Sequence, residues 1–304
     1  MDPLSELLSL LKPKSYITAG FDAGGSWALV LDDLAGRIKC YAVMEGECWL
    51  AVDAEDPILL REGDCFILPT GRRATIASDL GVEPKLASQT LDPDRSGEVV
   101  VYNGGGDVLL VGSRFELDGR HAEAMLGALP SFILVETSED RARLRLYIDL
   151  MMEEFRSGRP GASQVAQNLS HMMLAQALRL YIENLPEGHV GWFSALADPK
   201  LSLAIAAIHS EPSRGWTVEG LARRAGMSRT SFSQRFGLRV GETPISYLTR
   251  WRMMSAGAKL VQGQETIAQI AMTLGYSSEQ AFSTAFKRVM GHSPRHYARS
   301  QRAI

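Results

Sequence analysis

The C-terminal part of this 304-residue chain contains one residue pattern twice. Nine residues of the first copy recur in the second, three at a spacing of 49 residues and six at a spacing of 50. The recurring pairs are Thr217/Thr266, Ala222/Ala271, Gly226/Gly275, Phe232/Phe282, Ser233/Ser283, Phe236/Phe286, Gly241/Gly291, Pro244/Pro294 and Tyr247/Tyr297. The spacing between matching residues changes only once, by one residue. This indicates a duplicated structural unit whose copies differ in the length of one turn.

Each copy has the pattern of a helix, a glycine turn and a second helix. Thr217 and Thr266 precede short apolar runs with helical periodicity, where an N-cap belongs, and Gln269 completes a capping box in the second copy. Gly226 and Gly275 follow these runs, where a positive φ costs glycine least. The second helix of each copy carries inward phenylalanines, and a hydroxyl residue followed by proline begins the next helix. These residues are Phe232, Phe236, Thr243 and Pro244, then Phe282, Phe286, Ser293 and Pro294. The order predicts two helix-turn-helix units, whose second helices enter the major groove of DNA.

The distribution of charge distinguishes a DNA-binding domain from a helical domain that only forms a core. Residues 200–304 hold 15 Lys and Arg against 5 Asp and Glu, which leaves 17 basic and 30 acidic residues for positions 1–199. The overall net charge of −3 therefore hides a basic C-terminal third. Contacts with phosphates require such a surface, so duplication and charge together predict binding to double-stranded promoter DNA.

The residues that would face the duplex are those on the side of each second helix that lies away from the inward phenylalanines. They are Arg229, Thr230, Ser233, Gln234, Arg235, Ser278, Glu279, Gln280, Ser283, Thr284, Lys287 and Arg288. Gln234 can make two hydrogen bonds to adenine, and Ser or Thr can contact several bases. Arg229, Arg235, Lys287 and Arg288 suit phosphates, which position the protein on the duplex without selecting its sequence. For each of these residues the alternative is a solvated helix face.

Residues 200–304 resemble the C-terminal domain of AraC/XylS-type transcription regulators. The matching residues are Leu221-Ala222, Gly226-Met227-Ser228, Phe232-Ser233-Gln234-Arg235-Phe236, Ile267-Ala268, Gly275-Tyr276, Ala281-Phe282-Ser283-Thr284-Ala285-Phe286-Lys287-Arg288, Gly291-His292-Ser293-Pro294 and Tyr297. The resemblance implies two helix-turn-helix units joined by a long helix, both on one face of DNA. Residues 246–261 fit that connecting helix, whose length of roughly 24 Å would let the recognition helices enter major grooves about 34 Å apart.

Length and composition limit the rest of the chain. With 304 residues, 45% hydrophobic and 22% charged, the sequence predicts two soluble globular domains, each large enough for its own core. No run of 18 apolar residues occurs and the N-terminus carries no signal-like segment, so we expect a cytoplasmic protein without membrane contact. Three cysteines do not make a disulfide framework.

The first 118 residues or so predict β structure. Short apolar segments separated by Gly, Asp and Pro are typical of an antiparallel sandwich or barrel. The predicted strands span residues 27–31, 38–44, 48–52, 58–60, 65–68, 73–77, 99–102 and 108–116. This stretch resembles the cupin-like sensor domain that precedes many AraC-type DNA-binding domains. The matching residues are Tyr41-Ala42-Val43-Met44-Glu45-Gly46, Leu60-Arg61-Glu62-Gly63-Asp64-Cys65 and Leu68-Pro69-Thr70-Gly71. The expected fold class is α+β with two domains, a cupin-like β-barrel with flanking helices and an all-α double helix-turn-helix domain.

Histidine placement argues against a metalloenzyme. Metal-binding cupins carry two histidines after the first glycine of their motif and another just after the Pro-x-Gly. Here the segment after Gly36 has none, Ala74 stands at the later position, and no histidine precedes His121. A histidine-based metal site in the barrel is therefore not expected, nor a cofactor or enzyme activity. An alkyl-transferring repair regulator is equally disfavoured, because it needs four zinc-binding cysteines and a Pro-Cys-His-Arg motif.

The barrel is expected to bind a small-molecule effector of unknown identity. Tyr41 and Trp49 could stack on such a ligand, and Arg72 with Arg73 could bind a carboxylate or phosphate at the rim. The alternatives are core packing for the aromatic residues and surface exposure for the arginines. Cys40, Cys48 and Cys65 all fall on predicted strands. They suit a thiol-based redox sensor or, as the commoner alternative, buried packing.

Residues 139–185 predict two amphipathic helices separated by a break at 157–161. One apolar face comprises Leu144, Tyr147, Ile148, Met151, Met152 and Phe155, and the other Val165, Leu169, Met172, Met173, Gln176 and Leu180. Such helices either cover the barrel or pair with a second subunit, and the family resemblance implies a homodimer. The predicted domains are residues 1–138 for the barrel, 139–195 for dimerisation and linking, and 196–304 for DNA binding.

The leading function is a one-component regulator in which an effector in the barrel changes promoter binding. RNA polymerase is a further candidate partner. The alternatives are a redox-sensing regulator and a DNA-binding protein whose barrel serves only assembly.

Overall fold

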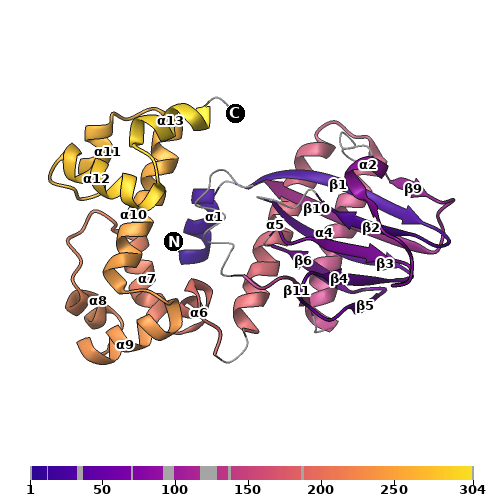
Figure 1. The fold of residues 1–304 in the computed structure, drawn as a ribbon, viewed down its shortest axis with the longest axis horizontal. Helices are drawn as coiled ribbons and strands as arrows, with labels where there is room; N and C mark the ends of the chain where they lie inside the picture. The colour runs from indigo at the N-terminus through magenta and orange to yellow at the C-terminus, as the bar shows by residue number, and fades with distance from the viewer. Residues whose placement is uncertain are drawn as a thin grey trace. The chain divides into compact units, whose positions relative to one another are not determined.

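The computed structural model describes residues 2–11, 13–32, 37–69, 71–91, 99–116, 129–135, 138–185 and 188–302. The chain divides into two compact units (Figure 1). The strand-rich unit is Pro13–Asn184, and the helical unit combines Met1–Lys12 with Leu185–Ile304. The expected α+β organisation, with β structure first and an all-helical C-terminal part, is confirmed. No helix among the described residues is long and apolar enough to span a membrane.

Two sheets form the strand-rich unit. The six-stranded sheet has the order β11 (Ile133–Val135), β6 (Cys65–Leu68), β3 (Arg37–Glu45), β10 (Val108–Glu116), β1 (Lys14–Ala23) and β9 (Val100–Tyr102). The five-stranded sheet has the order β5 (Ile58–Arg61), β4 (Glu47–Val52), β7 (Ala74–Ala77), β2 (Ala28–Leu31) and β8 (Lys85–Leu86), with the short helix α2 (Ala87–Thr90) following β8. Neighbouring strands are antiparallel except for the pairs β1–β9 and β2–β8.

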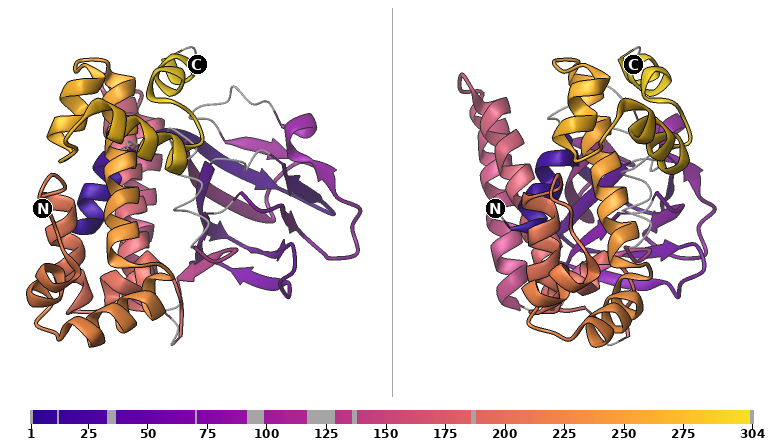
Figure 2. Two further views of the ribbon diagram at one scale, coloured as in Figure 1. Left: turned by 60° about the vertical axis from the view of Figure 1, so that its left-hand side comes forward. Right: turned by 90° about the vertical axis from the view of Figure 1, so that its left-hand side faces the viewer.

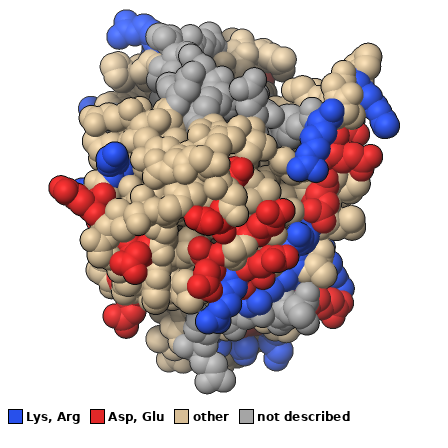
Figure 3. Space-filling view, turned by 90° about the vertical axis from the view of Figure 1, so that its right-hand side faces the viewer, with Lys and Arg blue, Asp and Glu red and all other residues tan. Residues whose placement is uncertain are grey.

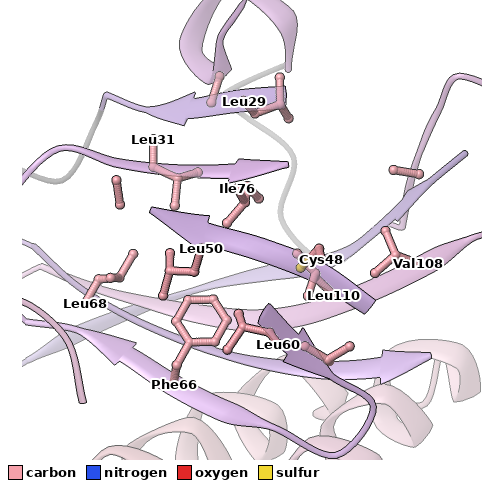
Figure 4. Packing of buried hydrophobic residues seen from close by; sticks show 14 of the residues in the cluster. Leu29, Leu31, Cys48, Leu50, Leu60, Phe66, Leu68, Ile76, Val108 and Leu110 are labelled. Atoms are coloured by element: carbon pink, nitrogen blue, oxygen red, sulfur yellow. The ribbon is translucent and has the colours of Figure 1, made fainter. Parts of the chain in front are cut away.

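One apolar core fills the space between the two sheets, as Figure 4 shows for part of the cluster. Side chains at every second position of a strand point into this core. In β4, for example, Cys48, Leu50 and Val52 point into the core, while the residues between them are half-buried on the other face. Phe66 of β6 and Leu110 of β10 meet this layer from the six-stranded sheet. Period-two burial of apolar side chains is therefore what holds the sheets together.

All eight predicted strands are present, and the described residues include three strands that were not anticipated. The two short ones, β8 and β11, have two and three residues. The third, β1, is long but carries a register shift between Thr18 and Gly20 where it pairs with β10. Such a bulge breaks the alternation by which a strand is recognised in a sequence.

Two long helices, α4 (Ser138–Ser157) and α5 (Ala162–Glu183), pack on the six-stranded sheet (Figures 1 and 2). Ser113 of β10 contacts the sulfur of Met151 in α4, and the ring of Phe115 lies 6.0 Å from that of His171 in α5. The predicted break between the helices is confirmed, with Gly161 at φ +85°. The side chain of Phe155 lies outside the described residues.

The predicted inward face of α4 agrees with the structure, whereas that of α5 is partly wrong. Met173, Gln176 and Leu180 of α5 are buried, but Val165 and Met172 are exposed. The buried face instead follows Ala166, Ser170, Met173, Leu174, Ala177, Leu178 and Tyr181. Both sets of residues repeat every three or four positions, as one face of a helix does. Periodicity alone therefore cannot tell which of the two overlapping faces is buried.

After residue 185, the described part of the helical unit contains two helix-turn-helix units and four further helices. The first unit is α8 (Val218–Arg224) with α9 (Arg229–Val240), and the second is α11 (Ile267–Thr273) with α12 (Glu279–Met290). Helix α10 (Pro244–Gln262) joins them and α13 (Pro294–Arg302) follows. Two helices, α6 (Trp192–Ala197) and α7 (Leu201–Ser210), come before the first unit.

The N-terminal helix α1 (Pro3–Leu11) packs on α7 and α10 of the helical unit. Leu7 is 2% exposed there, and an oxygen of Glu6 lies 3.4 Å from Nδ1 of His209. The grouping of the chain thus differs from the predicted domains at both ends of the barrel. Residues 1–12 group with the helical unit, and α4 and α5 group with the strands.

Candidate nucleic-acid interface

The first helix-turn-helix unit is closed by the caps that its sequence predicts. The hydroxyl of Thr217 accepts the amide N–H of Gly220 at 3.0 Å and begins α8. Gly226 takes φ +61° in the turn. The hydroxyl of Ser228 then accepts the amide N–H of Ser231 at 3.2 Å and begins α9. Each hydroxyl satisfies a backbone donor that the first turn of a helix leaves without a partner.

The second unit repeats this construction with a fuller cap. Thr266 and Gln269 form the predicted capping box, with the amide N–H of Gln269 donating to Thr266 Oγ1 at 3.2 Å and that of Thr266 donating to Gln269 Oε1 at 2.8 Å. Gly275 takes φ +81°, and Ser278 caps α12 by accepting the amide N–H of Ala281. The two copies therefore share their turn chemistry as well as their residues.

Each recognition helix is fixed from behind by its two phenylalanines. The inward residues Phe232, Phe236, Phe282 and Phe286 are all fully buried. In the first copy the ring of Phe236 packs edge-on against Tyr247 at 5.8 Å, and in the second the ring of Phe286 packs edge-on against Tyr297 at 5.5 Å. An equivalent phenylalanine–tyrosine pair fixes the orientation of the second helix in each copy. Helices α9 and α12 therefore each present one defined face to solvent.

Helix α10 joins the two units as one continuous element (Figure 2). Its 19 residues correspond to roughly 28 Å, slightly longer than the segment expected from the sequence. Thr243 caps it ahead of Pro244, and Gly263 ends it at φ +69°. Tyr247 and Trp251 are buried residues in the first half of α10, and Leu260 near its end belongs to the core of the second unit. Both units thus pack on a single helix, which holds their separation.

The predicted DNA-facing residues lie on the solvent side of α9 and α12. All of them are exposed except Ser283, which is half-buried. Ser278 and Thr284 have intramolecular roles as well, since the hydroxyl of Ser278 caps α12 and the hydroxyl of Thr284 donates to the carbonyl of Gln280 at 3.0 Å. Arg229, Thr230, Ser233 and Gln234 fall in the first half of α9, the end that contacts base edges in this type of unit.

Arg235 has a structural partner that the sequence did not indicate. Its Nε donates to Asp198 at 2.5 Å, and Asp198 is almost fully buried. The same carboxylate accepts the amide N–H groups of Lys200 and Leu201 at the start of α7. The ion pair therefore ties α9 to α7. The 37-residue separation of its members explains why local spacing gave no signal.

Several other basic residues of the helical unit make internal contacts. Arg250 pairs with Glu242, Lys259 pairs with Glu265, and Arg252 donates to the carbonyls of Pro212 and Arg214. The sequence interpretation left out several exposed cations, among them Arg223, which pairs with Glu219, and Arg224, Arg295 and Arg299. The adjacent arginines of α8 were a visible signal, because paired cations beside a predicted recognition helix favour phosphate contact. Figure 3 shows a face of the strand-rich unit, where acidic side chains lie next to basic ones.

The effector candidates in the strand-rich unit do not form one cluster. Tyr41 points into the sandwich and stacks on Phe66 with ring centroids 5.2 Å apart. Trp49 alternates with the core residues of β4, so it lies on the opposite face of its sheet. Arg72 donates to Ser131 Oγ at 2.9 Å, and Arg73 is exposed. Of these residues, only Tyr41 contributes to the interior.

The three cysteines are buried free thiols. Burial raises the pKa of Cys48 and of Cys65 to about 12, with the charge of Asp64 adding to the effect. Burial also raises the pKa of Cys40, and Cys65 adds to it. Thiolates are the reactive form of cysteine, so this environment favours the packing role over the redox alternative. Among the described residues no three His, Cys, Asp or Glu side chains are grouped as a metal site would need.

Similarity to known proteins covers both units. A cupin family model matches residues 2–183 and a helix-turn-helix domain model matches residues 221–300. An AraC-like transcription regulator from Streptomyces lividans is 39% identical over 300 residues, covering 98% of both chains. One from Streptomyces antibioticus is 38% identical over 299 residues, again covering 98% of both chains. The HTH-type transcriptional regulator AlkR of Acinetobacter baylyi is 33% identical over 309 residues, covering 98% of this chain and 99% of that protein.

Proposed function

The chain belongs to the AraC-like family of transcription regulators, and from this premise we propose that α9 and α12 read promoter DNA while the strand-rich unit responds to a small-molecule effector. The observation that carries the proposal is the repeated helix-turn-helix geometry on one connecting helix, α10. The net charge of +10 over residues 200–304 supplies the attraction to phosphates. We place this action in the cytoplasm, with binding rather than catalysis as its chemistry and RNA polymerase as a further partner at the promoter.

Gln234 is the residue on which we base sequence selection. It is exposed in the first half of α9, one turn from Thr230, and glutamine can make two hydrogen bonds to adenine. Arg229, Lys287 and Arg288 are assigned to phosphates. Arg235 is assigned there only through the donors that its bond to Asp198 leaves available.

The test is fluorescence anisotropy of the full chain on an operator selected from a random pool, with unselected DNA beside it. Gln234→Ala is expected to cost roughly 1–3 kcal/mol on the operator and little on unselected DNA. Gln262→Ala, which changes an exposed glutamine outside both recognition helices, is the matched control and leaves both affinities unchanged. Equal losses of Gln234→Ala on both DNAs would remove Gln234 from the base-reading set.

We also propose that the protein is a homodimer through α4 and α5. The outer stripe, defined as Leu146, Leu150, Val165 and Met172, is exposed on the two helices and apolar. A two-fold interface brings the same face of both copies together, so this apolar stripe would pack against its own counterpart.

A further inference from the structure

An open cleft lies beside the second helix-turn-helix unit, where α11 and α13 pack at the same end of α10 (Figure 1). Its volume is about 590 Å³, which is enough for side chains of a binding partner. Leu260 in the cleft is buried, and Ile267 and Ala298 are half-buried, so these residues form an apolar floor. Arg295 and Arg299 of α13 line the same cleft and are exposed. The cleft therefore combines an apolar floor with a cationic rim.

The repeat explains why the cleft is open in the second copy. Glu265 of the cleft corresponds to Trp216 of the first copy, at the spacing of 49 residues. Ala298 corresponds to Leu248, at the spacing of 50 residues. Trp216 and Leu248 are almost fully buried, and Nε1 of Trp216 donates to the carbonyl of Glu211 at 3.0 Å. In the second copy a methyl group replaces the leucine and a carboxylate side chain replaces the indole, which leaves less apolar volume to fill this space.

The charges at the cleft are also specific to the second copy. The positions of the first copy that correspond to Arg295 and Arg299 hold uncharged residues. The acidic residue that lines the cleft, Glu265, is paired with Lys259 at 2.6 Å, so its charge is balanced. Like charges four residues apart on a helix repel each other, and an anion at the rim would relieve that repulsion. The rim therefore suits a ligand with two negative groups about one helical turn apart.

We propose that this cleft is a docking site for an acidic segment of a partner protein. One apolar side chain of the partner packs on the floor of the cleft and leaves water there. Two carboxylates, four residues apart on a partner helix, bind Arg295 and Arg299. This partner is additional to the DNA and the effector of the proposed function, and the docking site depends on neither of them.

DNA phosphates are the other anions that two exposed arginines could bind. A phosphate would use Arg295 and Arg299 but would leave the floor of the cleft in contact with water, because it has no apolar group to bury there. An acidic segment with an apolar side chain uses both parts of the cleft. The apolar floor is therefore the observation that favours a protein partner.

The experiment measures binding of a labelled peptide to the full chain by fluorescence anisotropy. The acidic probe is a capped helical peptide with two glutamates four residues apart and one leucine beside them, and the matched peptide has glutamines in place of the glutamates. The acidic probe is expected to bind, and the glutamine peptide to bind at least about tenfold more weakly. Arg295→Gln combined with Arg299→Gln weakens binding of the acidic probe at least about tenfold. Arg223→Gln combined with Arg224→Gln removes two exposed arginines elsewhere in the helical unit and is the matched control, which leaves binding of the probe unchanged.

A further variant tests the apolar floor without changing any charge. Ala298→Leu introduces the side chain that the first copy has at this position and fills part of the cleft. It is expected to weaken binding of the acidic probe at least about tenfold. If Ala298→Leu does not fold, Ala298→Met fills the same space with a more flexible side chain.

The docking proposal is overturned if the acidic probe does not bind, if the glutamine peptide binds equally well, or if filling the cleft at Ala298 leaves binding unchanged. It is also overturned if replacing Arg295 and Arg299 lowers affinity for unselected DNA and leaves binding of the acidic probe unchanged, because the arginines would then serve phosphates. Anisotropy of the full chain on the selected operator without peptide reports DNA reading by itself. Failure of the docking proposal is therefore distinguishable from failure of the proposed function.

Discussion

Gly226 and Gly275 occupy equivalent positions in the two turns, yet their surroundings differ. Both have a positive φ, at +61° and +81°. A Cβ on Gly226 would meet open space, whereas a Cβ on Gly275 would lie 2.2 Å from the carbonyl oxygen of Ser213. Conformation alone therefore requires glycine in the first turn. Conformation and close packing both require it in the second.

The first residue-scale prediction compares these two glycines. Gly226→Ala is expected to lower the free energy of unfolding by about 1–2 kcal/mol, the cost of placing a side chain in the left-handed region. Gly275→Ala should cost clearly more, because the backbone carrying the Ser213 carbonyl must also move. Urea unfolding of the two variants, followed by tryptophan fluorescence, gives the comparison. Equal losses would show that the contact with Ser213 is relieved without cost.

His209 is a buried titratable group of the helical unit, at 5% exposure. Its ring stacks on Trp251 with centroids 3.4 Å apart, and its Nε2 lies 2.8 Å from the hydroxyl of Tyr247. Burial lowers the pKa of His209, which Glu6 opposes and Arg250 assists. The folded state therefore favours the neutral ring more than the unfolded state does.

A pH dependence follows from that direction. Because the folded pKa of His209 is below the ordinary value of 6.5, its contribution to stability is complete above pH 6.5 and is lost as pH falls from there through the folded pKa. Thermal melts of the full chain between about pH 5 and 8 should show this loss, and His209→Phe should flatten it. If the melting temperature of His209→Phe falls with decreasing pH as steeply as that of the native chain, the pH dependence arises from other groups.

At the scale of elements, the sequence predicted those whose signals are local. Strands with clean alternation, such as β4, and helices with hydroxyl caps, such as α11, agree with the structure. The bulged strand β1 and the inner face of α5 do not follow from the pattern, since one loses its period and the other has two overlapping stripes. The docking of α1 on α7 and α10 depends on contacts across most of the chain, which no local pattern encodes.

The exposed stripe on α4 and α5 leads to an element-scale prediction. Met172→Glu places a charge in the middle of the proposed dimer interface and is expected to weaken dimerisation at least about tenfold. Leu203→Glu, at a similarly exposed leucine of α7, is the control and leaves the oligomeric state unchanged. Sedimentation velocity over a range of concentrations measures both. A dimer of undiminished stability in Met172→Glu would place the interface elsewhere.

At the scale of the whole molecule, the candidate sites were predictable to different degrees. The solvent-facing side of α9 and α12 followed from the repeat, because the buried phenylalanines occupy matching positions in both copies. The bond between Arg235 and Asp198 was not predictable, since packing brings together two residues far apart in the sequence. The charge difference between the two parts of the chain restricts attraction to DNA to the basic helical unit.

The last prediction concerns α1, which packs at the N-terminal end of the chain against helices of the C-terminal part. Leu7 is buried at 2% exposure on a helix that packs on α7 and α10, so one end of the sequence stabilises the unit formed by the other. Leu7→Ala is expected to cost about 2–5 kcal/mol, whereas Leu203→Ala, at an exposed position of α7, costs little. Hydrogen exchange of the full chain locates the effect, with faster exchange expected in α7 and α10. If Leu7→Ala instead accelerated exchange only in the strands, α1 would belong with the barrel, as the sequence alone suggested.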